Sequence, residues 1–130
     1  MNTLRILVVD DDTAFRNGVE RYLKLRGYEN VRVAYSGEAA LEMIRNESPE
    51  VVLMDLYLPR MNGLTALREI RKINERIHVC MLTCEADQEY RDLAAKFGAL
   101  DYLIKPIPLE ELVTHIENRL KGEPPASHAA

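Results

Sequence analysis

The stretch LRILVVDDD (residues 4–12) joins a near-continuous apolar run, broken only by Arg5, to three consecutive carboxylates. Four more short apolar runs follow along the chain, at residues 31–35, 51–54, 78–82 and 102–104. They are rich in Val, Ile and Leu and short enough to be strands. Their continuous rather than alternating apolarity is typical of strands that are covered on both faces, as in a parallel sheet.

Between these runs the apolar spacing lengthens to that of a helix. Five sets of residues share a helical face: Phe15, Val19, Tyr22 and Leu23; Ala40, Leu41 and Ile44; Leu64, Leu67 and Ile70; Tyr90, Leu93, Ala94 and Phe97; and Leu109, Leu112, Val113, Ile116 and Leu120. Residues suited to begin or end helices flank these sets, namely Asp12, Ser36 and Asn62 as N-caps and Gly27, Gly98 and Gly122 as C-terminal stops.

The alternation of five strands with five helices predicts an α/β fold, a doubly wound parallel sheet with helices on both faces and right-handed crossovers. A barrel fragment and a thioredoxin-like mixed sheet are the competing architectures, but five strands are too few for a closed eight-stranded barrel. We expect one domain over residues 1–121. Residues 122–130 contain Pro124 and Pro125 and no apolar period, so we expect a disordered tail or the start of a linker.

The overall composition excludes few classes of function. The chain is 47% hydrophobic and 29% charged, and its formal net charge of -4 gives no reason to expect direct nucleic-acid binding. The absence of a bilayer-length apolar run and of a signal-peptide layout predicts a cytoplasmic protein without membrane contact. Cys80 and Cys84 form neither a disulfide framework nor, with the dispersed histidines, a zinc pattern, so we expect reduced, half-buried thiols in a strand segment.

Polar residues stand at the ends of the predicted strands. Asp10 and Asp11 close the first, Asp55 the third and Thr83 the fourth, and Lys105 follows the fifth. The carboxyl ends of parallel strands lie along one edge of the sheet, where doubly wound folds bind their ligands. The sequence therefore predicts that three carboxylates, one hydroxyl and one ammonium converge there.

The chemistry of this set points to phosphoryl transfer. Three neighbouring carboxylates repel one another and raise one another's pKa unless a cation shares them. Oxygen ligands suit Mg²⁺, which keeps several waters and takes phosphate oxygens as further ligands. A lysine would neutralise a phosphoryl oxygen and a threonine hydroxyl would donate to another. A metal beside a carboxylate nucleophile is therefore expected to act on a phosphoryl group.

Four motifs then occur in order: VVDDD (8–12), VLMD (52–55) with Pro59 and Gly63 after it, MLT (81–83) and GALDYLIKP (98–106). Over about residues 4–121 they resemble, in order and spacing, a receiver domain of two-component signalling, of the kind found in chemotaxis regulators. The resemblance implies a flavodoxin-like strand order, 2-1-3-4-5. It also implies a phosphorylation-dependent switch, not an enzyme beyond self-catalysed phosphotransfer and autodephosphorylation.

The resemblance assigns roles to the polar residues. Asp55 would be the phosphoacceptor. Asp11 would bind Mg²⁺ directly and Asp10 through water, while Asp55 and the backbone carbonyl of Tyr57 would complete the protein's ligands. Mn²⁺ would substitute for Mg²⁺.

Lys105, Thr83 and Tyr102 also match functional positions of the family. Lys105 would pair with the phosphoryl group, and its bond to Pro106 would be cis. Thr83 would move to hydrogen-bond the phosphoryl group, and the ring of Tyr102 would rotate with it. The face formed by the fourth helix, fifth strand and fifth helix would then change for a partner.

Four positions bear on how this receiver would differ from others. Tyr57 and Glu85 would border the path of the attacking water; Tyr57 would shield the acyl phosphate, whereas Glu85 would orient water, so the phosphorylated lifetime stays open. Cys84 replaces a smaller residue beside the site and would narrow access for small phosphodonors. His115 stands where receivers fused to winged-helix domains commonly carry an arginine of the dimer contact, so both a monomer and a phosphorylation-dependent dimer are expected alternatives.

The expected partners are a sensor histidine kinase or phosphotransfer protein and a downstream protein or fused output domain. One rival is a phosphatase of the haloacid dehalogenase kind, whose first strand carries Asp-x-Asp-x-Thr/Val; Asp10 and Asp12 fit that pattern and Ala14 does not. The other rival is a receiver that acts as a protein-interaction module without phosphorylation. Neither a Walker nor a dinucleotide-binding glycine motif is present.

Overall fold

The computed structural model describes residues 2–122. Strands and helices alternate along the chain: β1 (Asn2–Val9), α1 (Thr13–Leu25), β2 (Tyr28–Ala34), α2 (Gly37–Asn46), β3 (Val51–Met54), α3 (Gly63–Ile73), β4 (His78–Thr83), α4 (Gln88–Lys96), β5 (Asp101–Ile104) and α5 (Leu109–Leu120). The expected tail or linker, residues 122–130, lies outside the described residues except for Gly122.

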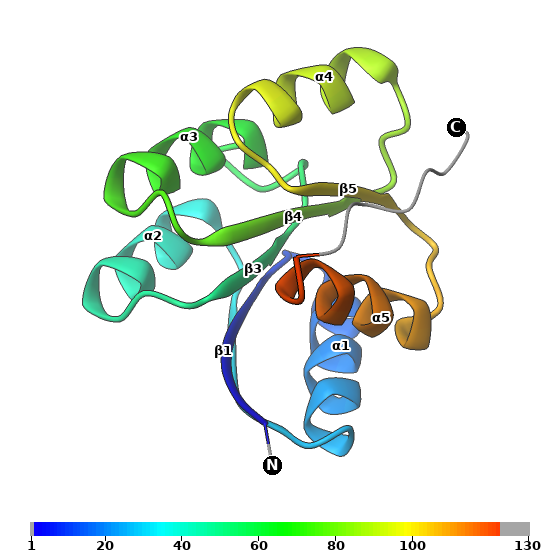
Figure 1. The fold of residues 1–130 in the computed structure, drawn as a ribbon. Helices are drawn as coiled ribbons and strands as arrows, with labels where there is room; N and C mark the ends of the chain where they lie inside the picture. The colour runs from blue at the N-terminus through cyan, green and yellow to red at the C-terminus, as the bar shows by residue number, and fades with distance from the viewer. Residues whose placement is uncertain (1, 123–130) are drawn as a thin grey trace.

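The strands form one parallel sheet in the order β2-β1-β3-β4-β5. This order confirms the predicted doubly wound, flavodoxin-like architecture and excludes the barrel fragment and the thioredoxin-like mixed sheet. Helices α1 and α5 cover one face of the sheet, and α2, α3 and α4 cover the other (Figure 1).

The continuous apolar runs are explained by this double cover. Along β1, Leu7 and Val9 pack in the core under α2, α3 and α4, whereas Ile6 and Val8 pack in the core under α1 and α5. Successive side chains of a strand point to opposite faces, so both sets must be apolar when both faces are buried.

The helix boundaries follow the predicted capping residues. The side chains of Asp12, Ser36 and Asn62 accept hydrogen bonds from backbone N–H groups three residues later, at 3.1, 3.1 and 3.0 Å. Each predicted C-terminal stop has a positive φ, 96° at Gly27, 99° at Gly98 and 82° at Gly122. This left-handed conformation is common where helices end and favours glycine.

The predicted bounds of β2 were wrong by several residues at its start. We expected this strand at residues 31–35, but it begins at Tyr28 and ends at Ala34. Of the three added residues, Tyr28 is buried, whereas Glu29 and Asn30 are exposed on this edge strand of the sheet. Polar residues on an edge strand interrupt the apolar run from which the strand was predicted.

The strand register positions the loops at the carboxyl edge of the sheet. Val9 of β1 pairs with Met54 of β3, so the residues that follow them, Asp10 and Asp55, are neighbours. Thr83 of β4 pairs with Ile104 of β5, directly before Lys105.

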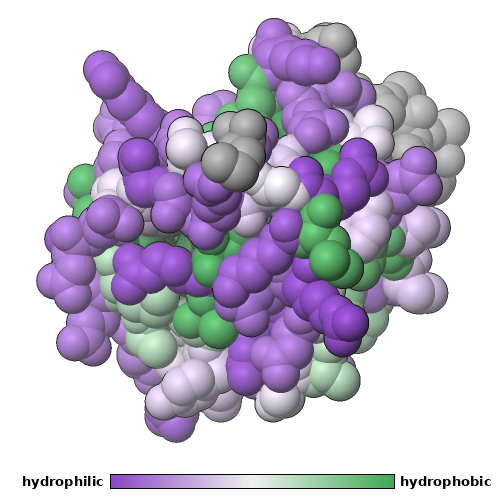
Figure 2. All heavy atoms as spheres, turned by 90° about the horizontal axis from the view of Figure 1, so that it is seen from below, coloured by the Kyte–Doolittle hydropathy of each residue, from purple (hydrophilic) through white to green (hydrophobic). Residues whose placement is uncertain are grey.

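The outer surface carries mixed polarity. Figure 2 shows one face on which hydrophilic side chains predominate, with smaller hydrophobic patches between them. Over residues 2–122, no helix combines the length and apolarity that a membrane span requires.

Candidate functional site

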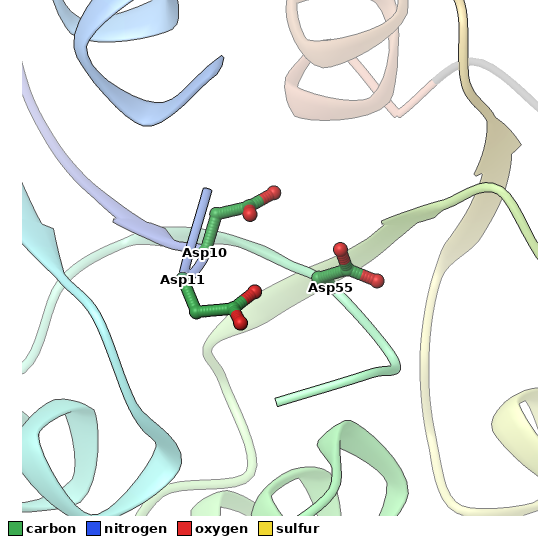
Figure 3. Close-up of side chains that lie close together, drawn as sticks. All are labelled: Asp10, Asp11 and Asp55. Atoms are coloured by element: carbon green, nitrogen blue, oxygen red, sulfur yellow. The ribbon is translucent and has the colours of Figure 1, made fainter. Parts of the chain in front are cut away.

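The three aspartates predicted to share a cation lie together at the carboxyl edge of the sheet. Asp10 and Asp11 follow β1 and Asp55 follows β3, and one carboxylate oxygen of each lies within 4.8 Å of the others (Figure 3). The backbone N–H groups of Asp10 and Asp55 donate to the carbonyls of Ala34 and Val9, both at 3.1 Å, so neighbouring strands hold both loops. Asp10 is 2% exposed and Asp55 9%, whereas Asp11 is exposed.

Lys105 joins two of these carboxylates. Its Nζ atom lies 2.6 Å from Asp10 Oδ2 and 3.0 Å from Asp55 Oδ2. Burial lowers the pKa of Lys105, but hydrogen bonds to the two carboxylates and attraction by their negative charges together outweigh burial, so the pKa is raised overall. Burial raises the pKa of Asp10, and the pKa stays above its ordinary value although Lys105 lowers it. The bond from Lys105 to Pro106 is cis, as the resemblance implies.

The donors available to a metal are all oxygens. Hard oxygen ligands are those that Mg²⁺ prefers, and the exposure of Asp11 leaves room for the waters that this ion keeps. Asp10, Asp11 and Asp55 therefore fit the metal that the sequence predicts. That the backbone carbonyl of Tyr57 also binds the metal stays a prediction.

The loop after Asp55 requires a close approach of α3. The Gly63 N–H donates to the Leu56 carbonyl at 2.7 Å, and a Cβ atom at Gly63 would lie 2.2 Å from the backbone oxygen of Asp55. Only glycine permits this contact. The Tyr57 N–H in turn donates to Asp55 Oδ1 at 3.1 Å, which orients the carboxylate.

Thr83 and Tyr102 meet at Glu85. Thr83 is fully buried, and its Oγ1 accepts a hydrogen bond from the Glu85 N–H at 3.3 Å. The Tyr102 hydroxyl donates to the Glu85 backbone carbonyl at 2.7 Å. Burial raises the pKa of Tyr102 to about 12, so the hydroxyl keeps its proton and remains a donor at neutral pH. Both predicted switch residues thus hydrogen-bond the same backbone segment.

The predicted tuning residues lie around the same edge. The Tyr57 hydroxyl donates to the Glu85 carboxylate, and this hydrogen bond raises the pKa of Tyr57. The second carboxylate oxygen of Glu85 accepts from the Asp87 N–H at 3.0 Å. Asp87 caps α4, so Glu85 connects the loop after Asp55 to the start of that helix.

The prediction of two half-buried thiols was wrong for both cysteines. Cys80 lies in β4 and is buried, which raises the pKa of its thiol. Cys84 is exposed, because β4 ends at Thr83 and Cys84 lies in the bend that follows. It lines a groove of about 580 Å³ beside Lys105, whose other walls are Ala14, Phe15, Gly18, Val19, Pro106, Ile107 and Leu109. Both thiols are free, as expected.

Two residues of α1 that the sequence did not single out also contact this site. The Arg16 Nη1 group donates to the backbone carbonyl of Asp10 at 3.0 Å. The ring centre of Phe15 lies 4.1 Å from Lys105 Nζ. Phe15 was assigned only to the core face of its helix, although its place in the first turn after an acidic loop could have indicated a contact with the site.

The sequence and the fold match one family. The sequence model of the response regulator receiver domain matches residues 6–117. Response regulator MprA of Mycobacterium avium is 36% identical over 126 residues, which are 97% of this chain and 55% of that protein. The chain thus spans about half the length of the curated relatives it matches.

Solved structures give the same result. A CheY-like response regulator receiver domain protein from Methanospirillum hungatei is 31% identical, with a TM-score of 0.89 over 93% of this chain and 96% of that one. A receiver domain protein from Clostridium thermocellum is 32% identical, with a TM-score of 0.84 over 92% and 95%. The chain belongs to the response regulator receiver domain family of two-component signalling.

Proposed function

We propose that this receiver is a phosphorylation-dependent switch that accepts a phosphoryl group on Asp55 from a sensor histidine kinase or phosphotransfer protein. The observation that supports this most directly is the ammonium of Lys105, which bridges Asp10 and Asp55. It provides a fixed positive charge next to a carboxylate oxygen and to the space that a phosphoryl group would enter.

In the proposed reaction a carboxylate oxygen of Asp55 attacks phosphorus. The new O–P bond forms as the N–P bond to the donor histidine breaks, and the imidazole leaves with the electron pair of that bond. Asp10, Asp11 and Asp55, with the Tyr57 backbone carbonyl, would hold Mg²⁺, or Mn²⁺ in its place. The metal would supply positive charge to the phosphoryl oxygens. Lys105 would pair with one of these oxygens, and the N–H of Tyr57 keeps Asp55 oriented.

The proposed switch starts at Thr83. If its hydroxyl turns to the phosphoryl group, its hydrogen bond from the Glu85 N–H must be lost or bent. The backbone carbonyl of Glu85 accepts a hydrogen bond from the Tyr102 hydroxyl, so a shift of Glu85 changes the contacts of the Tyr102 ring. Phosphorylation would thereby bias the α4-β5-α5 face between two conformations and change its affinity for a partner.

Three residues would set access and lifetime. Tyr57 and Glu85 hydrogen-bond each other beside Asp55, so the pair would both shield the acyl phosphate and hold the carboxylate that could orient water. Cys84 lines the groove that reaches Lys105 and would narrow the route for small donors.

The output would lie outside this receiver. Response regulator MprA is almost twice as long as the matched region, which suits a fused output domain after a receiver at residues 1–121 and a linker from 122. A separate downstream protein is the alternative. We propose a cytoplasmic regulator rather than an enzyme, which is either monomeric or dimerises on phosphorylation. His115 stands at the position where receivers fused to winged-helix domains commonly carry an arginine of the dimer contact. Its Nε2 atom lies 3.9 Å from the carboxylate of Glu111 on the same helix.

Intact mass measurement tests the proposal. The protein is incubated with acetyl phosphate and Mg²⁺, beside Asp55→Asn and a control, Asp92→Asn, at an exposed position of α4. We expect one added phosphoryl group in the wild type and the control, and none in Asp55→Asn or without Mg²⁺. If both acetyl phosphate and a histidine kinase fail although Mg²⁺ binds the folded protein, the interaction-module alternative replaces the switch.

A further inference from the structure

We propose that Phe15 is a positioning residue that holds the ammonium of Lys105 at the phosphorylation site through a cation–π contact. The proposal rests on the function of Lys105 proposed above. The ring centre of Phe15 lies 4.1 Å from Lys105 Nζ, well within the range of this interaction. The Lys105 side chain is only 17% exposed, so the ring competes with little water for the ammonium.

The first turn of α1 fixes the position of the ring. The Phe15 N–H donates to Asp12 Oδ1 at 3.1 Å, and this is the hydrogen bond that caps the helix. The following residue, Arg16, donates to the Asp10 carbonyl and so ties the same turn to the end of β1. The backbone of Phe15 is therefore held through its own N–H and through the side chain of the next residue, and the half-buried Phe15 lines the groove beside Lys105.

Asp10 and Asp55, which also contact the Lys105 ammonium, are carboxylates with a second proposed function. Asp10 and Asp55 hold the ammonium now, but both would turn to a metal ion or to a phosphoryl group during the reaction. An aromatic face attracts a cation without binding a metal and without a charge of its own. Phe15 is thus the one partner of Lys105, among these three, that keeps the ammonium in place while the carboxylates change ligands.

Replacement of the ring tests the contact against simple packing. We expect Phe15→Leu, which fills much of the same space, to slow phosphorylation of Asp55 by acetyl phosphate by about fivefold, the cost of one partly desolvated cation–π contact. Phe15→Tyr keeps an aromatic face and should restore most of the rate. If Leu and Tyr give equal rates, the proposal is wrong.

Fluorinated phenylalanine separates the electrostatic effect from shape. The chain has two phenylalanines, Phe15 and Phe97, so labelling a Phe97→Leu protein places fluorine at position 15 alone. Because successive fluorines weaken the negative ring face with little change in shape, the logarithm of the rate should fall steadily from one to three fluorines. The matched control labels Phe97, whose ring contacts Arg68 instead, in a Phe15→Leu protein and should show no trend. A flat series at position 15 overturns the proposal.

A measurement without metal or phosphodonor tests the contact itself. The ring current of Phe15 should shift the ε-methylene resonances of Lys105 upfield, and Phe15→Leu should remove the shift. If Asp55 is phosphorylated but neither the rates nor these resonances depend on the ring, the inference about Phe15 fails and the proposed function stands. If the shift is present and Asp55 accepts no phosphoryl group from any donor, the proposed function fails and the positioning role fails with it.

Discussion

The hydroxyl of Tyr57 donates a hydrogen bond to the carboxylate of Glu85, although 28 residues separate the two in the chain. Tyr57 stands two residues after Asp55, and Glu85 two residues after Thr83. The backbone of Glu85 also contacts Thr83 and Tyr102. This pair therefore links the loop of the proposed phosphoacceptor to both predicted switch residues.

Removing the Tyr57 hydroxyl should shorten the life of the phosphorylated protein. Tyr57→Phe keeps the aromatic ring but loses the hydroxyl, so the Glu85 carboxylate is released to orient water. A hydrogen bond contributes about 1 kcal/mol, so we expect dephosphorylation to be faster by about fivefold. The decay of the phosphorylated mass measures this rate, and Tyr35→Phe, at another exposed tyrosine, is the control. A slower decay would show that Glu85 does not act on water.

The features of the fold that could be predicted from sequence are those encoded by a repeating pattern of apolar residues. Parallel strands with both faces covered need continuous apolar runs, and their ends must meet at one edge, so the convergence of Asp10, Asp11, Asp55 and Lys105 followed from alternation alone. The start of the edge strand β2 was predicted wrongly, because its polar residues Glu29 and Asn30 break the pattern.

Side-chain contacts between loops could not be predicted in this way. The contacts of Tyr57 with Glu85 and of Phe15 with Lys105 depend on how far each loop departs from its strand, which periodicity does not encode. Cys84 illustrates the same point, since one residue decides whether a side chain ends a buried strand or begins an exposed bend. Resemblance to a family assigned functions to some of these positions but not their contacts.

Shortening Cys84 should widen the groove beside Lys105. Cys84→Ala is expected to speed phosphorylation by acetyl phosphate about two- to threefold, because less side chain restricts access, while the rate from a histidine kinase changes less. Cys80→Ala is unsuitable as a control, since that thiol is buried in the core. Rates from small donors that do not change in Cys84→Ala would exclude a steric role for this thiol.

Asp11 should lower the stability of the metal-free protein and raise it when Mg²⁺ is bound. Its carboxylate lies within 4.8 Å of two others and is the exposed member of the three. Asp11→Asn should raise the free energy of unfolding without metal by up to about 1 kcal/mol, since like charges at this distance repel. It should also abolish the stabilisation that Mg²⁺ gives the wild type. Urea unfolding with and without Mg²⁺ measures both effects; equal stabilisation by Mg²⁺ in both proteins would remove Asp11 from the metal site.

Two glycines should respond in opposite directions to alanine. At Gly63 a Cβ atom would lie 2.2 Å from the Asp55 oxygen and 2.9 Å from Leu56 Cα, both backbone atoms, so Gly63→Ala should cost about 3 kcal/mol or more. At Gly18, inside α1, a Cβ atom would meet nothing within 4 Å, so Gly18→Ala should stabilise by up to about 1 kcal/mol. Urea denaturation of both variants tests the pair, and a Gly63→Ala protein as stable as wild type would contradict the tight approach of α3 to Asp55.

His78 should make the protein less stable in mild acid. It begins β4, and its Nδ1 atom is buried without a hydrogen-bond partner among residues 2–122. Burial, together with Arg119 and Arg71, lowers the pKa of His78 below its ordinary 6.5, while Glu50 opposes this. The unfolded chain therefore binds the proton first as the pH falls, so stability is unaffected above about pH 7.5 and declines below the unfolded pKa of about 6.5.

Replacement of His78 tests this pH dependence. In His78→Gln the contribution of the imidazole disappears. As the pH falls, the difference in unfolding free energy between the two proteins should therefore shift in favour of the variant by up to about 1 kcal/mol per pH unit. Urea unfolding across that range measures the shift, and a difference that is constant with pH would mean that His78 titrates alike in the folded and unfolded chains.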